Sequence, residues 1–353
     1  MAVPDARRRK VLTVGPDING LGGISAVLQM YRRNVPGFAF SPTNSRRGTI
    51  AGAFVLGATL LKLPFYRLAG YDTVHAHGGS GKSYIRKRIV LGWARRLGFR
   101  TVFHCHGGGF AVFAQSRGKE RVSRELARYD AVAVLSGGWR RYFAGELGCR
   151  SVTVIDNMVE LPAVPVERRE VPEDEPVRFV FLGKLCRDKG VWDLLDALAS
   201  ERDSLDGRIK VSVGGNGDVD EFCRRTAELG LEGMVEYVGC VYGADKDALL
   251  RRCDVMLLPS YIEGMPITLL EAGVYAMPSI TTTVGGIPEL ITDGVQGTLL
   301  TPGDVPALAA AIKNYAGDRQ LILRQGCAAA EAVRTHLPDA VNAQLYKLYD
   351  SLS

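Results

Sequence analysis

The sequence lacks a cysteine pattern that would cross-link a fold. Its seven cysteines are odd in number, widely spaced and without a Cys-x-x-Cys pair. We therefore expect no disulfide framework and no structural zinc site, and this usage is typical of a reducing cytoplasm. A secretory leader is not expected either, because the first ten residues, MAVPDARRRK, lead directly into a strand pattern.

The sequence also lacks an uncharged run long enough to predict a membrane span. A strongly apolar run over residues 48–61 is ended by Lys62 and Pro64, whereas a span needs about 20 mainly apolar residues. The pattern of residues 48–66 predicts one helix with apolar sides. We favour a helix packed in the core, with a helix lying on a membrane surface as the alternative.

Acidic residues are scarce in the first half of the chain. Up to Glu160 there are 25 Lys and Arg against 9 Asp and Glu, a balance of +16, whereas the remainder has 19 against 29, a balance of −10. The strongly basic half fits an anionic membrane surface, a phosphorylated acceptor or nucleic acid. A solvated, arginine-rich face is an equally weighted alternative.

Length and patterning predict two α/β domains. The chain has 353 residues and 46% hydrophobic content, enough to bury two cores. Residues 160–176 contain four prolines and many charges, which indicates a linker. We expect a first domain over residues 1–165 and a second over 176–334, with a C-terminal helix over about 335–353 packing back onto the first.

Histidine is scarce too, and four of the five histidines lie in two similar segments, His75-Ala-His77-Gly-Gly and His104-Cys-His106-Gly-Gly. Residues i and i+2 of a strand share a face, so each segment could present two imidazoles to a metal. A hydrolytic metal centre would also need carboxylate ligands in the same cluster. For His75, His77 and His104 we favour structural histidines at strand ends, and we expect no metal.

Residues 254–289 organise the second half. A buried strand is followed by a Pro/Gly loop and a helix predicted to begin at Pro266, where the missing N–H of proline is not needed. The first-turn amides of Ile267, Thr268 and Leu269 would then form an anion site.

Two glutamates flank this predicted anion site. Glu263 lies in the loop before the helix, and Glu271 lies on the helix, roughly 7–8 Å along the axis from Pro266. Two acids on either side of a bound phosphate could hold the hydroxyl groups at both ends of a sugar nucleotide.

The run E-G-M-P-x-T-x-L-E from Glu263 to Glu271, with V-G-G-I-P-E downstream, resembles the retaining GT-B glycosyltransferases of the family 4 type (glycosyl transferases group 1), including polysaccharide-assembling members. Their two glutamates also stand eight residues apart. The resemblance covers nearly the whole chain and is strongest over residues 179–304. It implies two Rossmann-like domains facing across a cleft, with the nucleotide mostly on the second.

The resemblance also implies roles for individual residues. The segment from Gly183 to Gly190 matches Gly-Arg-Leu-x-x-x-Lys-Gly, whose two cations clamp the donor diphosphate; Lys184 replaces the arginine and loses its bidentate fork. Catalytic roles are implied for His106, Glu263 and Lys189. Donor contacts are implied for Gly22, Gly23, Lys184, Gly215, Gly264, Met265, Pro266, Ile267, Thr268 and Glu271. Acceptor-side contacts are implied for Lys82, Ser83, Tyr84, Arg86 and Lys87.

Two rival motifs point to other chemistry. Ala76-x4-Gly81-Lys82-Ser83 matches a relaxed P-loop pattern after a strand, but glycine is missing at its first position. Asp218-Val-Asp220 is a DxD motif of the kind that binds a divalent metal in another glycosyltransferase fold. We favour helix-start acids for this pair.

The predicted function is metal-independent, retaining transfer of a hexose from a UDP- or GDP-linked sugar to a glycan or lipid-linked acceptor in cell-surface polysaccharide assembly. No cofactor and no nucleic acid partner are expected. The predicted location is the cytoplasm, with attachment to an anionic inner membrane face as a further hypothesis. A GT-B-fold sugar-nucleotide epimerase and, less favoured, a P-loop NTPase are the alternatives.

Overall fold

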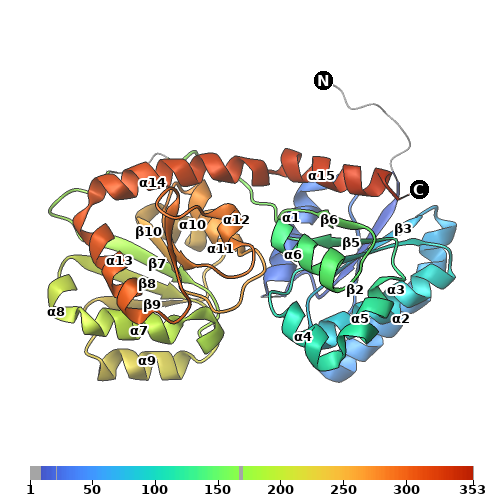
Figure 1. Cartoon of the computed structure of the whole chain (residues 1–353), viewed down its shortest axis with the longest axis horizontal. Coiled ribbons are helices and arrows are strands. Elements are labelled where there is room, and N and C mark those ends of the chain that lie inside the picture. The colour runs from blue at the N-terminus through green and yellow to red at the C-terminus, as the bar shows by residue number, and fades with distance from the viewer. Residues whose placement is uncertain (1–8, 21, 167–169, 353) are drawn as a thin grey trace. The chain divides into compact units, whose positions relative to one another are not determined.

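The computed structural model describes residues 9–20, 22–166 and 170–352 (Figure 1). The chain divides into two compact units. Unit 1 comprises residues 1–158 together with 338–353, and unit 2 comprises residues 159–337.

Unit 1 contains a parallel sheet of six strands in the order β2-β1-β3-β4-β5-β6, with helices on both faces (Figure 1). Its strands are β1 Val11–Gly15, β2 Ala39–Pro42, β3 Thr73–Gly78, β4 Arg100–Cys105, β5 Ala131–Val134 and β6 Val152–Val154. Its helices are α1 Gly23–Asn34, α2 Thr49–Leu68, α3 Gly81–Arg96, α4 Phe110–Arg117, α5 Lys119–Leu126, α6 Gly137–Arg141, the π-helical turn η1 Tyr142–Glu146, and α15 Pro338–Asp350.

The C-terminal helix α15 is part of unit 1. Tyr349 lies within 2.7 Å of a ring nitrogen of His75 in β3, measured from its hydroxyl oxygen to Nδ1. The side-chain amide of Gln344 donates to Asp156 at 2.7 Å, just after β6. These contacts join the last helix to the first sheet, although the two lie far apart in the sequence.

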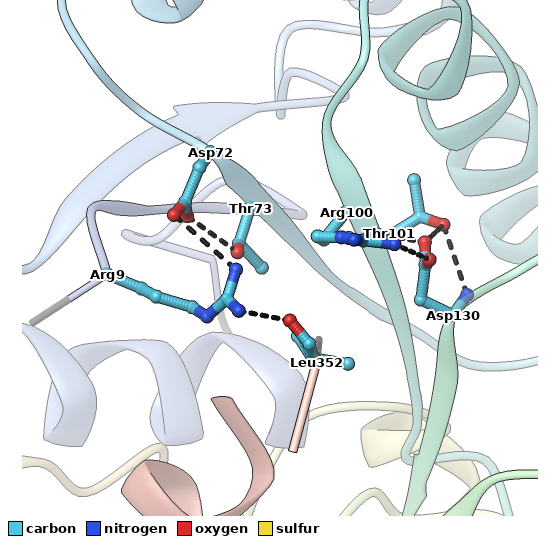
Figure 2. A network of polar contacts seen from close by, with 7 residues as sticks. All are labelled: Arg9, Asp72, Thr73, Arg100, Thr101, Asp130 and Leu352. Carbon is cyan, nitrogen blue, oxygen red and sulfur yellow. Dashed lines mark hydrogen bonds and ion pairs between the residues drawn. The ribbon is translucent and has the colours of Figure 1, made fainter. Parts of the chain in front are cut away.

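A polar network ties the ends of the chain to the amino-terminal edge of this sheet (Figure 2). Arg9, just before β1, pairs with Asp72 at 3.5 Å and donates to the carbonyl of Leu352. Asp130 accepts hydrogen bonds from both the amide and the hydroxyl of Thr101 at 2.8 Å. Two of the few acidic side chains of unit 1 are thus used structurally, at the edge opposite to the carboxyl ends of the strands.

Unit 2 repeats the architecture with a parallel sheet in the order β12-β11-β10-β7-β8-β9. Its strands are β7 Val177–Leu182, β8 Ile209–Gly214, β9 Val235–Gly239, β10 Val255–Leu258, β11 Ser279–Thr282 and β12 Gly297–Leu300. Its helices are the 3-10 turn η2 Arg187–Lys189, α7 Val191–Ser200, α8 Arg202–Leu205, α9 Val219–Glu228, α10 Gly243–Arg252, α11 Ile267–Val274, α12 Ile287–Leu290, α13 Val305–Gly317, α14 Arg319–Ala332 and the 3-10 turn η3 Val333–His336.

The predicted α/β class is confirmed, since each unit is built on a parallel six-stranded sheet with helices. Strands covered on both faces must be apolar along their whole length rather than at alternate positions. The run Val255–Leu258 of β10 is buried at all four positions and lies between β7 and β11. This central strand leads directly into the loop that carries Glu263.

Helix α2 corresponds to the helix predicted over residues 48–66, and it continues through Pro64. A proline cannot donate to the carbonyl four residues earlier, here that of Leu60. The indole Nε1 of Trp93 in α3 donates to that carbonyl instead, at 3.2 Å. A neighbouring helix therefore satisfies the backbone group that the proline leaves without its helical partner.

The preference for core packing of α2 is wrong. Only Gly52, Thr59 and Leu63 of this helix are buried. By length and composition α2 is able to cross a membrane, and it is the only such helix in the described ranges, with a mean hydropathy of 1.4. The uncharged run of residues 48–61 is therefore shorter than the apolar helix, which continues past Lys62 and Pro64 to Leu68.

Candidate active site

The predicted donor residues of unit 2 follow the carboxyl ends of four neighbouring strands. Lys184 and Lys189 come after β7, Gly215 after β8 and Glu263 after β10, and the V-G-G-I-P-E turn comes after β11. In a parallel sheet these ends lie at one edge, where ligands of open α/β sheets bind. Residues from distant parts of the sequence are thereby collected in one region.

Glu263 forms the centre of this region. Its side chain is only 8% exposed, and its Oε1 accepts from Lys189 Nζ at 2.5 Å and from Ser260 Oγ at 2.8 Å. A buried carboxylate needs such partners because burial without them is costly. The ion pair holds both predicted catalytic side chains of unit 2 in place.

Close backbone contacts position the two members of this pair. Gly190, which follows Lys189, has φ +69°, and a Cβ there would lie 1.9 Å from the carbonyl oxygen of Pro259. Gly285 has φ +59°, and a Cβ there would lie 2.0 Å from the carbonyl oxygen of Glu263. Only glycine fits both the left-handed backbone and the close contact. The structure therefore explains why glycine stands at Gly190 of the Gly183–Gly190 segment and at Gly285 of the V-G-G-I-P-E turn.

Helix α11 begins one residue later than predicted. Pro266 is its N-cap residue, with φ −73° and ψ 123°, and Ile267 is the first helical residue. The amide of Leu269 donates to the Pro266 carbonyl at 3.2 Å, so it does not belong to the predicted set of free amides. Of the three, those of Ile267 and Thr268 remain oriented as first-turn amides for an anion.

The loop before α11 is itself fixed by backbone contacts. Gly264 accepts a hydrogen bond on its carbonyl from the amide of Gly286 at 2.7 Å. Met265 is buried. These two predicted donor residues shape the loop that leads to Pro266.

Glu271 is the second buried carboxylate, on the first turns of α11, and is 9% exposed. Lys246 of α10 donates to its Oε1. Lys246 and Ser260 were not among the predicted site residues. Neither belongs to a motif, and only the packing of α10 and of the β10 loop brings them to the glutamates.

Gly215 follows the carboxyl end of β8, but both of its backbone groups already have partners within unit 2. Its amide donates to the Gly239 carbonyl at 2.9 Å, and its carbonyl accepts from the Tyr237 hydroxyl at 2.7 Å. The Gly215 amide is therefore not free to bind a donor, and the contact implied for this residue stays a prediction. Lys184 is exposed in the loop after β7.

Asp218 is the N-cap residue of α9 and Asp220 lies in its first turn. These are the positions expected of helix-start acids.

Unit 1 gathers the histidines of β3 and β4. The strand register places His77 beside His104, and the side chains of His75, His77 and His104 are fully buried. Each offers a nitrogen, and these three atoms lie within 4.8 Å of one another. Among the described residues this potential metal-binding group contains histidine alone, without a carboxylate.

Burial keeps these imidazoles neutral. It lowers the pKa of His75 to about 3 and the pKa values of His77 and His104 well below the usual 6.5, with the neighbouring histidines adding to the effect. His106 follows β4, and its Nε2 lies 2.9 Å from His77 Nδ1. Burial, with a smaller effect of the Lys87 charge, lowers the pKa of His106 to about 3. A neutral ring can exchange hydrogen bonds but is a weak base at pH 7.

The predicted acceptor-side residues differ in exposure. Lys82 is exposed on the first turn of α3, and Arg86 is half-buried. Ser83 accepts a hydrogen bond on its hydroxyl from the Gly79 amide at 3.3 Å. Tyr84 is fully buried among aromatic rings, so its predicted contact with an acceptor is wrong. Lys87 is also fully buried, and its Nζ donates to the Thr43 hydroxyl at 2.8 Å.

The P-loop alternative is not supported by the local geometry. Strand β3 continues to Gly78, and α3 begins at Gly81. Only two residues, Gly79 and Ser80, connect them. A phosphate-cradling loop needs several successive backbone amides around the anion, and a two-residue connection is too short to supply them.

Gly22 and Gly23 lie at the start of α1, as its N-cap residue and its first residue. Both are exposed, and a Cβ at either position would meet no atom within 4 Å. Nothing in the described packing therefore requires glycine there. Their predicted contact with a donor stays a prediction.

Residues 165–331 match the family model "Glycosyl transferases group 1". The chain is 29% identical to glycogen synthase from Mycobacterium tuberculosis over 184 residues, which are 52% of this chain and 44% of that protein. It is 31% identical to lipopolysaccharide 1,6-galactosyltransferase from Salmonella typhimurium over 180 residues, 49% of this chain and 48% of that protein. The matched region thus spans less than half the length of these curated relatives.

Solved structures resemble the chain over nearly its whole length. Sucrose-phosphate synthase from Thermosynechococcus elongatus has a TM-score of 0.79 at 20% identity and covers 98% of this chain and 99% of its own. Anabaena HepE in complex with UDP-glucose has a TM-score of 0.76 at 20% identity, covering 97% and 99%. Likeness at this identity shows the fold alone, which is that of the GT-B glycosyltransferases.

Proposed function

We propose that this chain transfers a hexose from a UDP- or GDP-linked sugar to a glycan or lipid-linked acceptor, a proposal supported by the match of residues 165–331 to the group 1 glycosyl transferases. The observation that carries the proposal is the ion pair between the half-buried Lys189 and the buried Glu263, which lies in the loop before α11. The pair joins a cation, which suits the diphosphate of a sugar nucleotide, to an acid, which suits the hydroxyl groups of its sugar.

The cationic part of the site suits the departing diphosphate. Lys189 and the exposed Lys184 follow the same strand, and the amides of Ile267 and Thr268 open α11. Fixed donors and cations directed at developing negative charge are usually the largest electrostatic contribution to catalysis. We propose that these groups stabilise the leaving diphosphate without a divalent ion.

The two buried glutamates suit the two sugars of the donor. We propose that Glu263 binds hydroxyl groups of the transferred sugar and supports positive charge at its anomeric carbon. Glu271, further along α11, holds the ribose hydroxyls. Each carboxylate already has a lysine partner, so its orientation is fixed before a donor arrives, which lowers the cost of ordering on binding.

The acid–base requirements fit a retaining reaction in which the leaving phosphate takes the acceptor proton. The lowered pKa of His106 favours a hydrogen bond from this ring to the donor sugar or the acceptor over proton abstraction. The acceptor side is assigned to unit 1, with Lys82, Ser83 and Arg86 as its candidate contacts. The reaction would take place at the cytoplasmic side of a membrane, where seven free cysteines are compatible with the redox environment.

A thermal-shift panel of UDP, GDP, ADP and ATP, each with magnesium and with EDTA, tests the donor class. Stabilisation by UDP or GDP that survives EDTA is expected; HepE, a structural relative, has been crystallised with UDP and with UDP-glucose. Stabilisation by ATP alone, abolished by EDTA, would overturn the proposal. Incubation with the corresponding sugar nucleotide and no acceptor then separates transfer from epimerisation, since only an epimerase would convert the donor to an equilibrium mixture of epimers under those conditions.

A further inference from the structure

Helix α2 exposes an apolar stripe that the protein itself does not cover. The stripe consists of Ile50, Phe54, Leu61, Phe65 and Leu68, whose exposed fractions lie between 71% and 85%. At about 100° per residue the five positions fall within an arc of about 60°. Large apolar side chains exposed together in this way mark an interaction site.

The opposite side of the same helix anchors it to unit 1. The buried residues Gly52, Thr59 and Leu63 lie about 180° from the centre of the stripe. The Thr59 hydroxyl donates to the Pro42 carbonyl at 2.6 Å and lies 2.8 Å from the Ser41 hydroxyl. Because α2 is packed against unit 1 along one side, the stripe is held outward as a fixed surface feature.

The sequence around the stripe is strongly positive. Between residues 18 and 119 there are 15 Lys and Arg but one acidic residue, Asp72, which is already paired with Arg9. Arg46 and Arg47 precede α2, and Lys62 and Arg67 are exposed on it. Positive charges at both ends of an apolar stripe are characteristic of a segment that lies on an anionic lipid surface.

Helix α3, which contacts α2 through Trp93, adds an arginine-rich cavity of about 600 Å³. We call it the arginine cavity after its four arginines, Arg88, Arg95, Arg96 and Arg128. Glu125 is the only acid in its lining, and its charge is offset by Arg117 at 3.1 Å and Arg88 at 3.7 Å. Arg95, Arg96 and Arg128 are exposed, which suits several phosphate groups at a surface.

We propose that the α2 stripe, together with the arginine cavity, docks this protein onto a bilayer containing anionic phospholipid. The stripe extends about 27 Å along the helix axis at about 1.5 Å per residue, and its side chains would enter the boundary between headgroups and acyl chains. The inference extends the proposed function, because a docked enzyme would meet a lipid-linked acceptor. It rests on different residues from those of the donor site.

Charge argues against a second copy of the chain as the occupant. A symmetric dimer through α2 would bring the same basic region of both copies together. With 15 Lys and Arg against one acid between residues 18 and 119, such a contact would be repulsive, whereas an anionic bilayer offers complementary charge along the whole stripe.

Vesicle flotation of the full chain tests the proposal. The probes are phosphatidylcholine vesicles with and without about 30% phosphatidylglycerol, since anionic lipid attracts basic segments. We expect flotation with the anionic vesicles and at least about tenfold weaker partition to phosphatidylcholine alone.

The triple variant Phe54→Gln, Leu61→Gln, Phe65→Gln should lower partition to anionic vesicles at least about tenfold, because three exposed apolar side chains would no longer insert. Arg95→Gln with Arg96→Gln should lower it about fivefold for each arginine.

Matched variants in unit 2 control for general surface effects. Leu161→Gln, Val164→Gln and Val295→Gln change three apolar side chains that are 46–66% exposed, and Arg324→Gln with Arg334→Gln removes the same charge as the α3 variant. Both should float like the unmodified chain. Circular dichroism melting verifies that every variant is folded, which we expect because the altered side chains are exposed.

Several outcomes would overturn the docking proposal. The first is an unmodified chain that floats with neither kind of vesicle. The second is a pair of stripe and arginine variants that float as well as the unmodified chain. The third is a lipid-free dimer that the stripe variant converts to a monomer.

The nucleotide panel separates this proposal from the enzymatic one. Stabilisation by UDP or GDP without flotation rejects docking alone, and flotation without nucleotide stabilisation rejects the transferase assignment alone.

Discussion

At the scale of single residues, the candidate site depends on carboxylates that are buried and paired before any ligand arrives. Glu263 shares one oxygen between Lys189 and Ser260, and Glu271 is paired with Lys246. Removing one partner of such a pair leaves a buried charge without compensation, which is costly. The pairs therefore serve both the stability of unit 2 and the orientation of the groups proposed to bind the donor.

Lys189→Ala should lower kcat by about a hundredfold or more, because Lys189 is proposed to meet the charge that develops on the leaving diphosphate. Arg187→Ala is the matched control, since Arg187 lies in the same 3-10 turn and is exposed; it should change kcat little. Steady-state kinetics with a sugar nucleotide measures both. A Lys189→Ala variant with a near-normal kcat and an unchanged melting temperature would remove Lys189 from the mechanism.

Glu271→Gln should weaken UDP or GDP binding by about tenfold or more, because a hydrogen bond to a charged group contributes about 1.5–3 kcal/mol. Asp247→Asn is a suitable comparison. Asp247 lies on α10 close to the site and is paired with Arg251 and Tyr275, but it has no proposed contact with the donor. Isothermal titration calorimetry gives both affinities, and equal losses in the two variants would indicate a general effect on packing rather than ribose binding.

At the scale of elements, close backbone contacts between loops position the side chains of the site. The turn after β11 contacts the loop after β10 through Gly285 and Glu263, and the turn after β7 contacts Pro259 through Gly190. Each contact joins segments from different strands at the carboxyl edge of the sheet. The geometry of Glu263 thus depends on two glycines that carry no chemistry of their own.

Gly285→Ala should destabilise unit 2 and weaken donor binding, because its Cβ would lie 2.0 Å from the Glu263 carbonyl oxygen. Gly294→Ala provides the control: its φ is +76°, and nothing lies within 4 Å of an added Cβ. The control should lose only the strain of a left-handed alanine, about 1–2 kcal/mol. Urea unfolding and nucleotide titration measure the difference, and equal losses at the two positions would show that the loop contact is unimportant.

The histidine cluster of β3 and β4 should make unit 1 sensitive to acid. The pKa of His75 is lowered from 6.5 to about 3, so the unfolded chain binds its proton between these values while the folded chain does not. The contribution to stability is complete above pH 6.5 and is lost as the pH falls toward 3, at up to about 1.4 kcal/mol per pH unit for one such group.

A double variant tests the contribution of His75. His75→Leu with Tyr349→Phe removes both partners of the 2.7 Å hydrogen bond, and it should make the loss of stability between pH 7 and pH 5 less steep, with the other buried histidines causing the rest. Tyr349→Phe alone retains the imidazole and should retain the slope. Urea unfolding midpoints at several pH values provide the measurement, and an unchanged slope in the double variant would mean that other groups cause the acid sensitivity.

At the scale of the whole molecule, the two units carry different chemistry on the same architecture. Unit 2 places paired acids, cations and helix amides at the carboxyl edge of its sheet. Unit 1 places neutral imidazoles at the corresponding edge, and it carries the exposed α2 stripe and the arginine cavity. The division matches the charge asymmetry of the sequence, in which the first half is basic and the second half is acidic.

Nucleotide binding should therefore protect unit 2 selectively in hydrogen exchange. At a UDP or GDP concentration about a hundredfold above Kd, ligand binding stabilises the binding-competent state by about 2.7 kcal/mol. We expect slower exchange in residues 183–190 and 263–271 and little change in β3. Mass spectrometry of peptides from both units provides the measurement. Protection confined to residues 76–83 by ATP would instead favour the P-loop alternative.

The sequence by itself determined the features that depend on local pattern. Apolar runs such as Val255–Leu258 predicted buried parallel strands, and the segment from Glu263 to Glu271 predicted a loop followed by a helix at the end of one of them. Both are found, with the helix beginning at Ile267 rather than Pro266. Strand and helix periodicity and turn chemistry are properties of neighbouring residues, so they can be read without the fold.

Tertiary structure alone decided which groups meet and which faces are covered. Lys246 and Ser260 pair with the glutamates although no motif contains them, and Tyr84 is buried although its sequence neighbours Lys82 and Ser83 are not. Helix α2 is apolar on both sides, so its sequence pattern is the same whether one side or both are buried. Burial depends on which other elements pack against a face, and residues distant in the chain determine that packing.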